Sequence, residues 1–162
     1  MSHRSLVGLI VALVASCVLS PAAAQSAAVE VSLVSVIPGT PTGDGDWCVG
    51  GLGSRPDPVA LTAHVVHLAS QSEVTEGTLE WQVCESPRGG FPKEVCDTGG
   101  GPARWKAAVL SFLDFDSMPT LVTRFKLPVL GFRMQYRPAP GGVFKTATSA
   151  SFNLDRTCSP LP

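Results

Sequence analysis

Segments in which apolar and polar residues alternate with a period of two recur along the chain. In the segment 77–84, GTLEWQVC, Leu79, Trp81 and Val83 share one side, and the residues between them are polar. Successive side chains of a β-strand point to opposite faces of its sheet, so this pattern predicts a strand with one buried face. Similar alternation predicts six further strands, at 28–36, 59–68, 104–111, 120–127, 131–137 and 147–155.

The seven predicted strands indicate an all-β fold, since no window of the sequence has helical periodicity. Nearly every strand has a single apolar face, which is typical of antiparallel sheets packed face to face in a β-sandwich. The connections 37–58 and 85–103 are rich in glycine and proline and are predicted to be long, irregular loops. The same alternation places Trp105 on one face with Ala107 and Val109.

The first 24 residues have the organisation of a secretory signal peptide. His3 and Arg4 form a short basic start, an apolar run follows at 6–19, and small residues end the segment at 22–24. The apolar run is too short to cross a bilayer core. We therefore expect residues 25–162 to form one secreted or periplasmic domain without a transmembrane segment.

A second interpretation of the same region stays open. The segment 13–17, LVASC, resembles the lipobox of bacterial lipoproteins, and Cys17 would then be the lipidated first residue of an outer-membrane lipoprotein. Against this, the chain stays apolar after Cys17 and then offers a conventional cleavage site after Ala24.

The net charge of the chain gives no support for a nucleic-acid partner. Cleavage removes only Arg4, so the 12 basic and 13 acidic residues become 11 and 13. A nearly balanced, sparsely charged domain does not attract polyanions or anionic membranes through its bulk charge.

Four cysteines are left to pair after either cleavage, because Cys17 is removed or lipidated, and an even number in an exported chain indicates two disulfides. Three pairings are open. We favour Cys84–Cys96, a short loop closed at the surface, and Cys48–Cys158, which would tie the start of the domain to its end. A zinc site is not expected, because the sequence has no C-x-x-C motif and no histidine close to a cysteine.

Three segments in a fixed order carry a resemblance to a known family. They are PVALTAHVVHL, then GTLEWQVC, then a glycine-led strand closing on a tyrosine and followed by a strand rich in Ser, Thr and Ala. This order resembles a bacterial immunoglobulin-like domain, of the type repeated in large surface proteins. The matching positions are Val59, Leu61, Ala63, Val65, Gly77, Leu79, Trp81, Gly131 and Tyr136.

The resemblance covers roughly residues 28–156 and implies an immunoglobulin-like sandwich with Trp81 in its core. The chain departs from those repeats in its four cysteines, in an apparent insertion at 85–103, and in having a single copy. Cys84 has the opposite parity to Trp81 and ends the same strand, which favours a structural disulfide over a reactive thiol.

The resemblance implies an exported binding or structural module, with adhesion-type contacts to an unidentified protein. We expect no catalytic residues, cofactor or metal, because the chain has neither a G-x-S-x-G elbow nor a Cys/His signature. A carbohydrate-binding module that uses loop aromatics is the alternative. The candidate binding residues are Trp47, Phe91, Trp105, Arg133, Gln135 and Arg137.

Two further sets of polar residues have alternative interpretations. Glu80 and Gln82 are predicted to face outward beside the outward face of 131–137, as a ladder of cross-strand pairs or as a recognition face. The acidic pairs at 44 and 46 and at 114 and 116 supply oxygen ligands of the kind calcium prefers, but each pair lacks a full ligand set. His64 and His67 fall on opposite faces of a strand and are not expected to share a metal.

Overall fold

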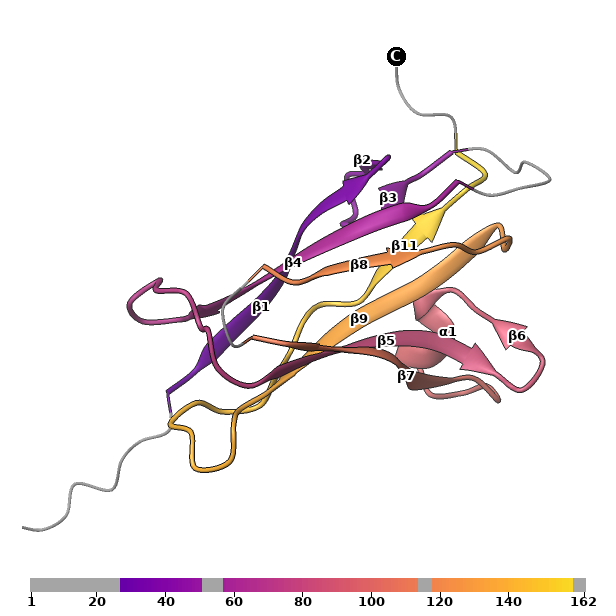
Figure 1. The fold of residues 1–162 in the computed structure, drawn as a ribbon. Helices are drawn as coiled ribbons and strands as arrows, with labels where there is room; N and C mark the ends of the chain where they lie inside the picture. The colour runs from indigo at the N-terminus through magenta and orange to yellow at the C-terminus, as the bar shows by residue number, and fades with distance from the viewer. Residues whose placement is uncertain (1–26, 51–56, 114–117, 159–162) are drawn as a thin grey trace, which may run out of the picture.

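The computed structural model describes residues 27–50, 57–113 and 118–158, which form a sandwich of two β-sheets (Figure 1). One sheet has three strands in the order β1-β4-β8. The other follows the order β2-β3-β11-β9-β5-β6, with β10 paired to β9 and β7 paired to β5. The strands are β1 (Val29–Ile37), β2 (Thr40–Pro41), β3 (Trp47–Cys48), β4 (Val59–His67), β5 (Thr78–Ser86), β6 (Gly89–Gly90), β7 (Arg104–Phe112), β8 (Thr120–Thr123), β9 (Val129–Arg137), β10 (Ala147–Thr148) and β11 (Phe152–Asp155), with one helix, α1 (Lys93–Asp97).

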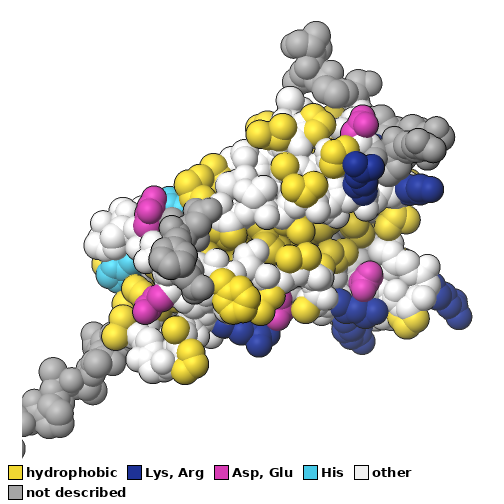
Figure 2. Space-filling view, in the orientation of Figure 1, with side chains coloured by type: hydrophobic (Ala, Val, Ile, Leu, Met, Phe, Trp, Pro, Cys, Tyr) yellow, Lys and Arg dark blue, Asp and Glu magenta, His cyan; other side chains and the backbone are white. Residues whose placement is uncertain are grey.

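The core lies between the two sheets, where Figure 2 shows a band of hydrophobic side chains, and contains most of the apolar residues that the alternation predicted, but not Ala107, Val109 or Ala150, which are exposed. Trp81 is fully buried there, and its indole N–H donates to Ser111 Oγ at 3.3 Å. Tyr136 is also buried, and its hydroxyl donates to the Glu76 carbonyl at 3.1 Å. Each aromatic residue therefore buries its ring while its polar atom is hydrogen-bonded.

Two irregularities in the strand register change which face of the sheet later side chains occupy. In β1 the register shifts between Leu33 and Ser35, so that Val36 points inward. In the β5–β7 pair the register shifts beside Trp81, and this shift reverses the expected face of Trp105. Val109 pairs with Trp81 on the core face, whereas Trp105 pairs with Cys84 on the outer face. The prediction that Trp105 and Val109 share a face was therefore wrong, because a β-bulge changes the parity of all later residues.

All seven predicted strands are present, with two changes of extent. The strand expected at 120–127 ends at Thr123, although Phe125 still packs into the core. The strand expected at 147–155 is divided into β10 and β11. The two glycine-rich connections also contain the short strands β2, β3 and β6 and the helix α1. Five residues are too few for a helical period to be visible in the sequence.

Both favoured disulfides are present, Cys48–Cys158 and Cys84–Cys96, with sequence separations of 110 and 12 residues. The expectation that the shorter bridge lies at the surface was wrong. Cys84 is fully buried, and Phe91, Val95 and Trp105 pack around the bridge in a small cluster outside the main core.

Within the described ranges, no helix is long and apolar enough to cross a membrane. The predicted signal peptide, with Cys17 and the cleavage site after Ala24, lies outside the described residues.

Candidate functional site

The two long loops meet at one end of the sandwich, around the side chain of Asn153. Asn153 lies on β11 and is only 5 % exposed. Its backbone N–H and its side-chain Nδ2 donate to Asp46, in the loop 37–58, at 2.8 and 3.1 Å. Its side-chain oxygen accepts from the backbone N–H of Lys93, in the loop 85–103, at 2.8 Å. One buried amide therefore connects two loops that are distant in sequence.

An ion pair and a second carboxylate complete this cluster, which we call the loop junction: Asp46, Lys93, Glu94 and Asn153. The Lys93 ammonium group pairs directly with Asp46, and these two side chains are 17 and 16 % exposed. Asn153 Nδ2 also donates to Glu94 Oε1 at 3.0 Å. Hydrogen bonds to charged groups are stronger than neutral ones, so the junction holds both loops in a fixed arrangement.

The approach of α1 to the sheet depends on Gly131. Its backbone N–H donates to the Phe91 carbonyl at 2.9 Å, and a Cβ at this position would lie 2.7 Å from Lys93 Cα. Only a residue without a side chain allows the two backbones to come this close.

A hollow of about 350 Å³ adjoins the loop junction, and four carboxylates, Asp44, Asp46, Glu94 and Asp155, line it. Thr42 donates a hydrogen bond to the Asp44 carboxylate, and this bond lowers the pKa of Asp44. Across the described residues, no group of three or more His, Cys, Asp or Glu side chains is arranged to hold a metal ion. Residues 114 and 116, the second acidic pair of the sequence analysis, lie outside the described residues.

The outward faces of β5 and β9 carry the predicted polar ladder. Gln82 lies opposite Arg133, and Glu80 lies opposite Gln135. Arg133 Nε donates to Gln82 Oε1 at 2.7 Å, and Arg137 pairs with Glu80 at 3.2 Å. These polar groups largely satisfy one another.

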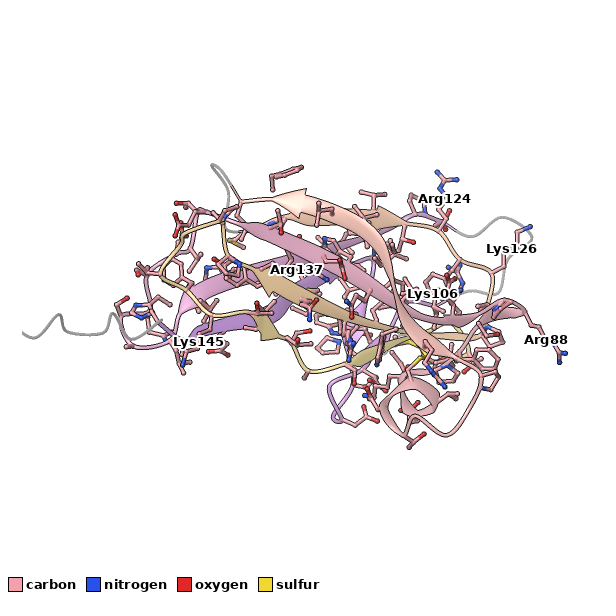
Figure 3. The ribbon with its side chains drawn as sticks, turned by 90° about the horizontal axis from the view of Figure 1, so that it is seen from below. Arg88, Lys106, Arg124, Lys126, Arg137 and Lys145 are labelled. Carbon is pink, nitrogen blue, oxygen red and sulfur yellow. A yellow bond between two sulfur atoms is a disulfide. The ribbon has the colours of Figure 1, made fainter. Side chains whose placement is uncertain are left out.

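Arg133 also connects the ladder to the cluster around the Cys84–Cys96 bridge. Its guanidinium carbon lies 4.7 Å from the centre of the Trp105 ring, within the range of a cation–π contact. Partial burial lowers the pKa of Arg133 by disfavouring its charge, while Asp97 and Glu80 oppose that effect. Figure 3 labels Arg88, Lys106 and Arg137 on the sheet that contains β5 and β9.

The structure brings some of the predicted binding residues together and separates others. Arg133, Gln135 and Arg137 share the outward face of β9, and Trp105 stacks beside them. Phe91 packs around the Cys84–Cys96 bridge with Trp105, whereas Trp47 packs against the main core on β3. The three aromatic residues therefore do not form one platform.

The loop junction contains residues that the sequence analysis did not single out, namely Lys93, Glu94 and Asn153. Asn153 is the chain's only asparagine, and its position between two apolar residues of a predicted strand is the one signal that could have indicated a buried polar role.

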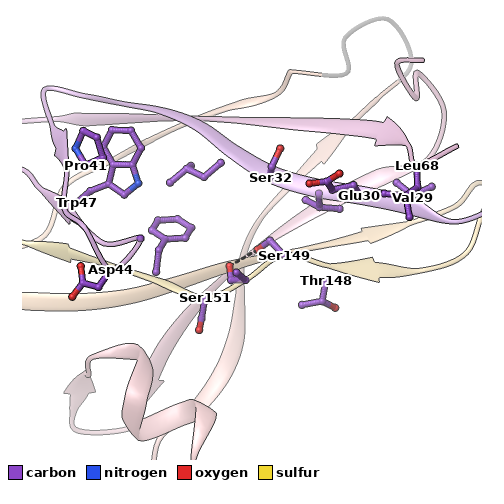
Figure 4. Close-up of a pocket in the computed structure, with 15 residues that line it drawn as sticks. Val29, Glu30, Ser32, Pro41, Asp44, Trp47, Leu68, Thr148, Ser149 and Ser151 are labelled. Atoms are coloured by element: carbon purple, nitrogen blue, oxygen red, sulfur yellow. Dashed lines mark hydrogen bonds between the residues drawn. The ribbon is translucent and has the colours of Figure 1, made fainter. Parts of the chain in front are cut away.

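A second hollow, a slot of about 660 Å³, lies between β1 and residues 148–152 (Figure 4). Trp47 and Phe152 contribute apolar surface to it, together with Val31 and Leu33 of β1. Of the described residues that line the slot, Glu30 and Asp44 are charged. Figure 4 places Asp44 beside Trp47 and Glu30 beside Leu68, toward opposite ends of the slot.

Comparisons with known proteins found no significant match to this chain among family models, curated proteins or solved structures.

Proposed function

We propose that this chain is an exported immunoglobulin-like module that binds another protein at the cell envelope or exterior and has no catalytic activity. Numbering only the strands of four or more residues along the chain (β1, β4, β5, β7, β8, β9 and β11), one sheet has the order 1-2-5 and the other 7-6-3-4. Constant-type immunoglobulin domains share the 1-2-5 and 7-6-3 neighbours and place their fourth strand beside the fifth instead. This partial agreement supports the immunoglobulin-like assignment.

Export is supported by the two disulfides, because such bonds persist in oxidising compartments and are rare in the cytosol. The intact mass of the protein recovered from its native envelope tests both forms of the proposal. A mass that begins at Gln25 supports a secreted or periplasmic domain, and a mass that begins at Cys17 with added lipid supports an anchored lipoprotein. A mass that retains the first residues without lipid would contradict both.

The observation that carries the binding role is the loop junction. Two long loops are each anchored by a disulfide and are joined to each other through Asn153 and Asp46. Loops that are already ordered lose little conformational entropy when a partner binds, so less of the interaction energy is lost on association. We propose that the combined surface of the loops 37–58 and 85–103 makes the partner contacts.

Two glycines allow a test that changes this surface without disturbing the fold. A Cβ added at Gly43 or at Gly100 would meet no atom within 4 Å, so Gly43→Lys and Gly100→Lys each add a charged side chain in open space. The matched control is Ala69→Lys, in the exposed turn after β4 at the other end of the sandwich (Figure 1). Quantitative cross-linking in the native envelope would compare the three variants with the wild-type protein.

We expect one or more partners that cross-link to the wild-type protein and to Ala69→Lys to be lost or strongly reduced with the two loop variants. Circular dichroism and thermal unfolding would establish that all variants remain folded. Equal recovery of every partner by the loop variants and the control would contradict a binding role for the loops.

A further inference from the structure

The β1 edge of the three-stranded sheet has no strand partner within the described residues. β1 pairs only with β4, and the Leu68 N–H donates to the Ala28 carbonyl at 2.9 Å. In an antiparallel strand, every second residue forms backbone hydrogen bonds with the same neighbouring strand. The Leu68–Ala28 bond therefore identifies which residues of β1 bond to β4. Glu30 and Ser32 therefore direct their backbone groups toward β4, and Val29, Val31 and Leu33 direct theirs toward the open edge.

The slot lies along this open edge, and another segment of the chain borders it at each end. At one end Ala27 bridges to the chain before β10, since its N–H donates to Val143 O at 2.7 Å and its carbonyl accepts from Lys145 N–H at 2.9 Å. At the other end the β2–β3 segment borders the slot with Pro41 and Trp47. Its length along β1, residues 29–33, matches a short extended peptide, because a strand advances about 3.3 Å per residue.

The lining of the slot indicates the chemistry of its occupant. Apolar side chains from both sheets, among them Val31 and Phe152, provide a surface for alternate apolar side chains of an extended chain. Both charged residues in the lining, Glu30 and Asp44, are acidic and exposed, and they lie toward opposite ends. Charge complementarity therefore favours a segment with basic residues at its ends.

We propose that the slot binds an extended segment of a partner protein, which adds to the free edge of β1 as a further strand. The backbone of the segment pairs with Val29, Val31 and Leu33, its apolar side chains enter the slot, and its Lys or Arg residues face Glu30 and Asp44. Strand addition of this kind obtains affinity from main-chain hydrogen bonds and specificity from alternate side chains. This inference rests on the proposed binding function and names a second contact surface along β1, which borders the loop 37–58 at Asp44 and Trp47.

Amide hydrogen exchange measured by NMR tests the site directly. The probe is a blocked synthetic peptide with Lys at each end and Val alternating with Thr between them. We expect saturating peptide to slow exchange at the Val29, Val31 and Leu33 amides by about tenfold or more, because amides at a free edge exchange readily and paired amides do not. A matched peptide is N-methylated at the alternate amides that would face β1. It keeps its side chains but loses the donors to the β1 edge, and we expect it to give no protection.

A charge-reversal variant separates specific recognition from general attraction. Glu30→Lys combined with Asp44→Lys is expected to weaken binding of the Lys-ended peptide about tenfold or more and to strengthen binding of a Glu-ended analogue. The matched control is Asp57→Lys combined with Glu73→Lys, which makes the same change in net charge at two other exposed positions. We expect this control to leave both affinities within about twofold.

Three outcomes would overturn the proposal. They are no protection of the β1 amides, protection at the other exposed edge strands β7 or β8 instead, and equal effects of the two double variants. Failure here is distinguishable from failure of the proposed function through Gly100→Lys, because Gly100 belongs to the loop 85–103, of which no residue lines the slot, whereas Gly43 is next to Asp44. A partner lost with Gly100→Lys would support the loop surface even if no peptide enters the slot.

Discussion

Asp46 accepts hydrogen bonds from both the backbone N–H and the side-chain amide of Asn153, at 2.8 and 3.1 Å, across a sequence separation of 107 residues. This contact joins the first long loop to β11. The Asn153 oxygen accepts from Lys93 in the second loop, so one side chain contributes to holding both loops, together with the Lys93–Asp46 ion pair.

We expect Asn153→Ala to lower the free energy of unfolding by about 1–3 kcal/mol, because it leaves the Lys93 N–H without its acceptor and removes the amide that donates to Asp46 and Glu94 in a largely buried place. Urea denaturation measures the change. Asp46→Ala alone and the double variant complete a cycle, in which we expect the two losses to be clearly non-additive. Additive losses would mean that the two residues act independently.

The nearly isosteric Asn153→Asp tests the same contact through charge. It would place a third carboxylate beside Asp46 and Glu94, with no amide to donate to them. Like charges held close together raise the pKa of one of them, so we expect the variant to be least stable at neutral pH and to regain stability as the pH falls. A pH-independent loss would show that shape, and not charge, decides the effect.

The two disulfides are expected to contribute unequally. Chain-entropy reasoning assigns about 5 kcal/mol to Cys48–Cys158 and about 3 kcal/mol to Cys84–Cys96, since they close loops of very different length. Paired Cys→Ala variants, compared by thermal and urea unfolding, measure both contributions. A larger loss from the shorter bridge would mean that packing of Phe91 and Trp105 around it outweighs the effect of loop length.

Gly131→Ala is expected to displace α1 from β9. The added Cβ would meet the backbone of Lys93, and overpacking of this kind costs about 1–3 kcal/mol. The matched control is Gly100→Ala, where no atom lies within 4 Å of the added carbon, and we expect a change within about 0.5 kcal/mol. Equal stabilities of the two variants would contradict the close approach at Gly131.

The only tyrosine of the chain, Tyr136, provides a direct probe of the core. Burial, with a smaller contribution from Glu76, raises the pKa of Tyr136 to about 12 from its usual 10.0. The unfolded state therefore ionises first, so the contribution of Tyr136 to stability is complete below pH 10 and is lost as the pH rises toward 12.

Tyrosinate absorbance follows this single group, and we expect folded protein to ionise near pH 12 and urea-unfolded protein near pH 10. Tyr136→Phe is the control. This variant has no hydroxyl to ionise, so we expect it to lose less stability between pH 10 and 12 than the wild-type protein. Ionisation of the folded protein near pH 10 would contradict a buried, hydrogen-bonded hydroxyl.

Local patterns in the sequence were sufficient to predict the strands and the disulfide pairing. Alternation places Leu79 and Trp81 on the same face, whichever strands pair with theirs, because the alternation of side chains is a local property of an extended strand. The same reasoning failed at Trp105, since the bulge beside Trp81 arises from pairing between two strands. The burial of Cys84 likewise depends on the residues that the loop 85–103 folds over it.

The sequence by itself determined which segments become strands, which faces are apolar and which cysteines can form a short and a long bridge, because these properties depend on neighbouring residues and on spacing. Only the tertiary structure decided that Asp46, Lys93 and Asn153 meet, and that β1 borders the slot with an edge that no strand of the described residues covers. Both features depend on how distant strands are ordered in the two sheets. That order is set by the packing of the whole core, which no local pattern contains.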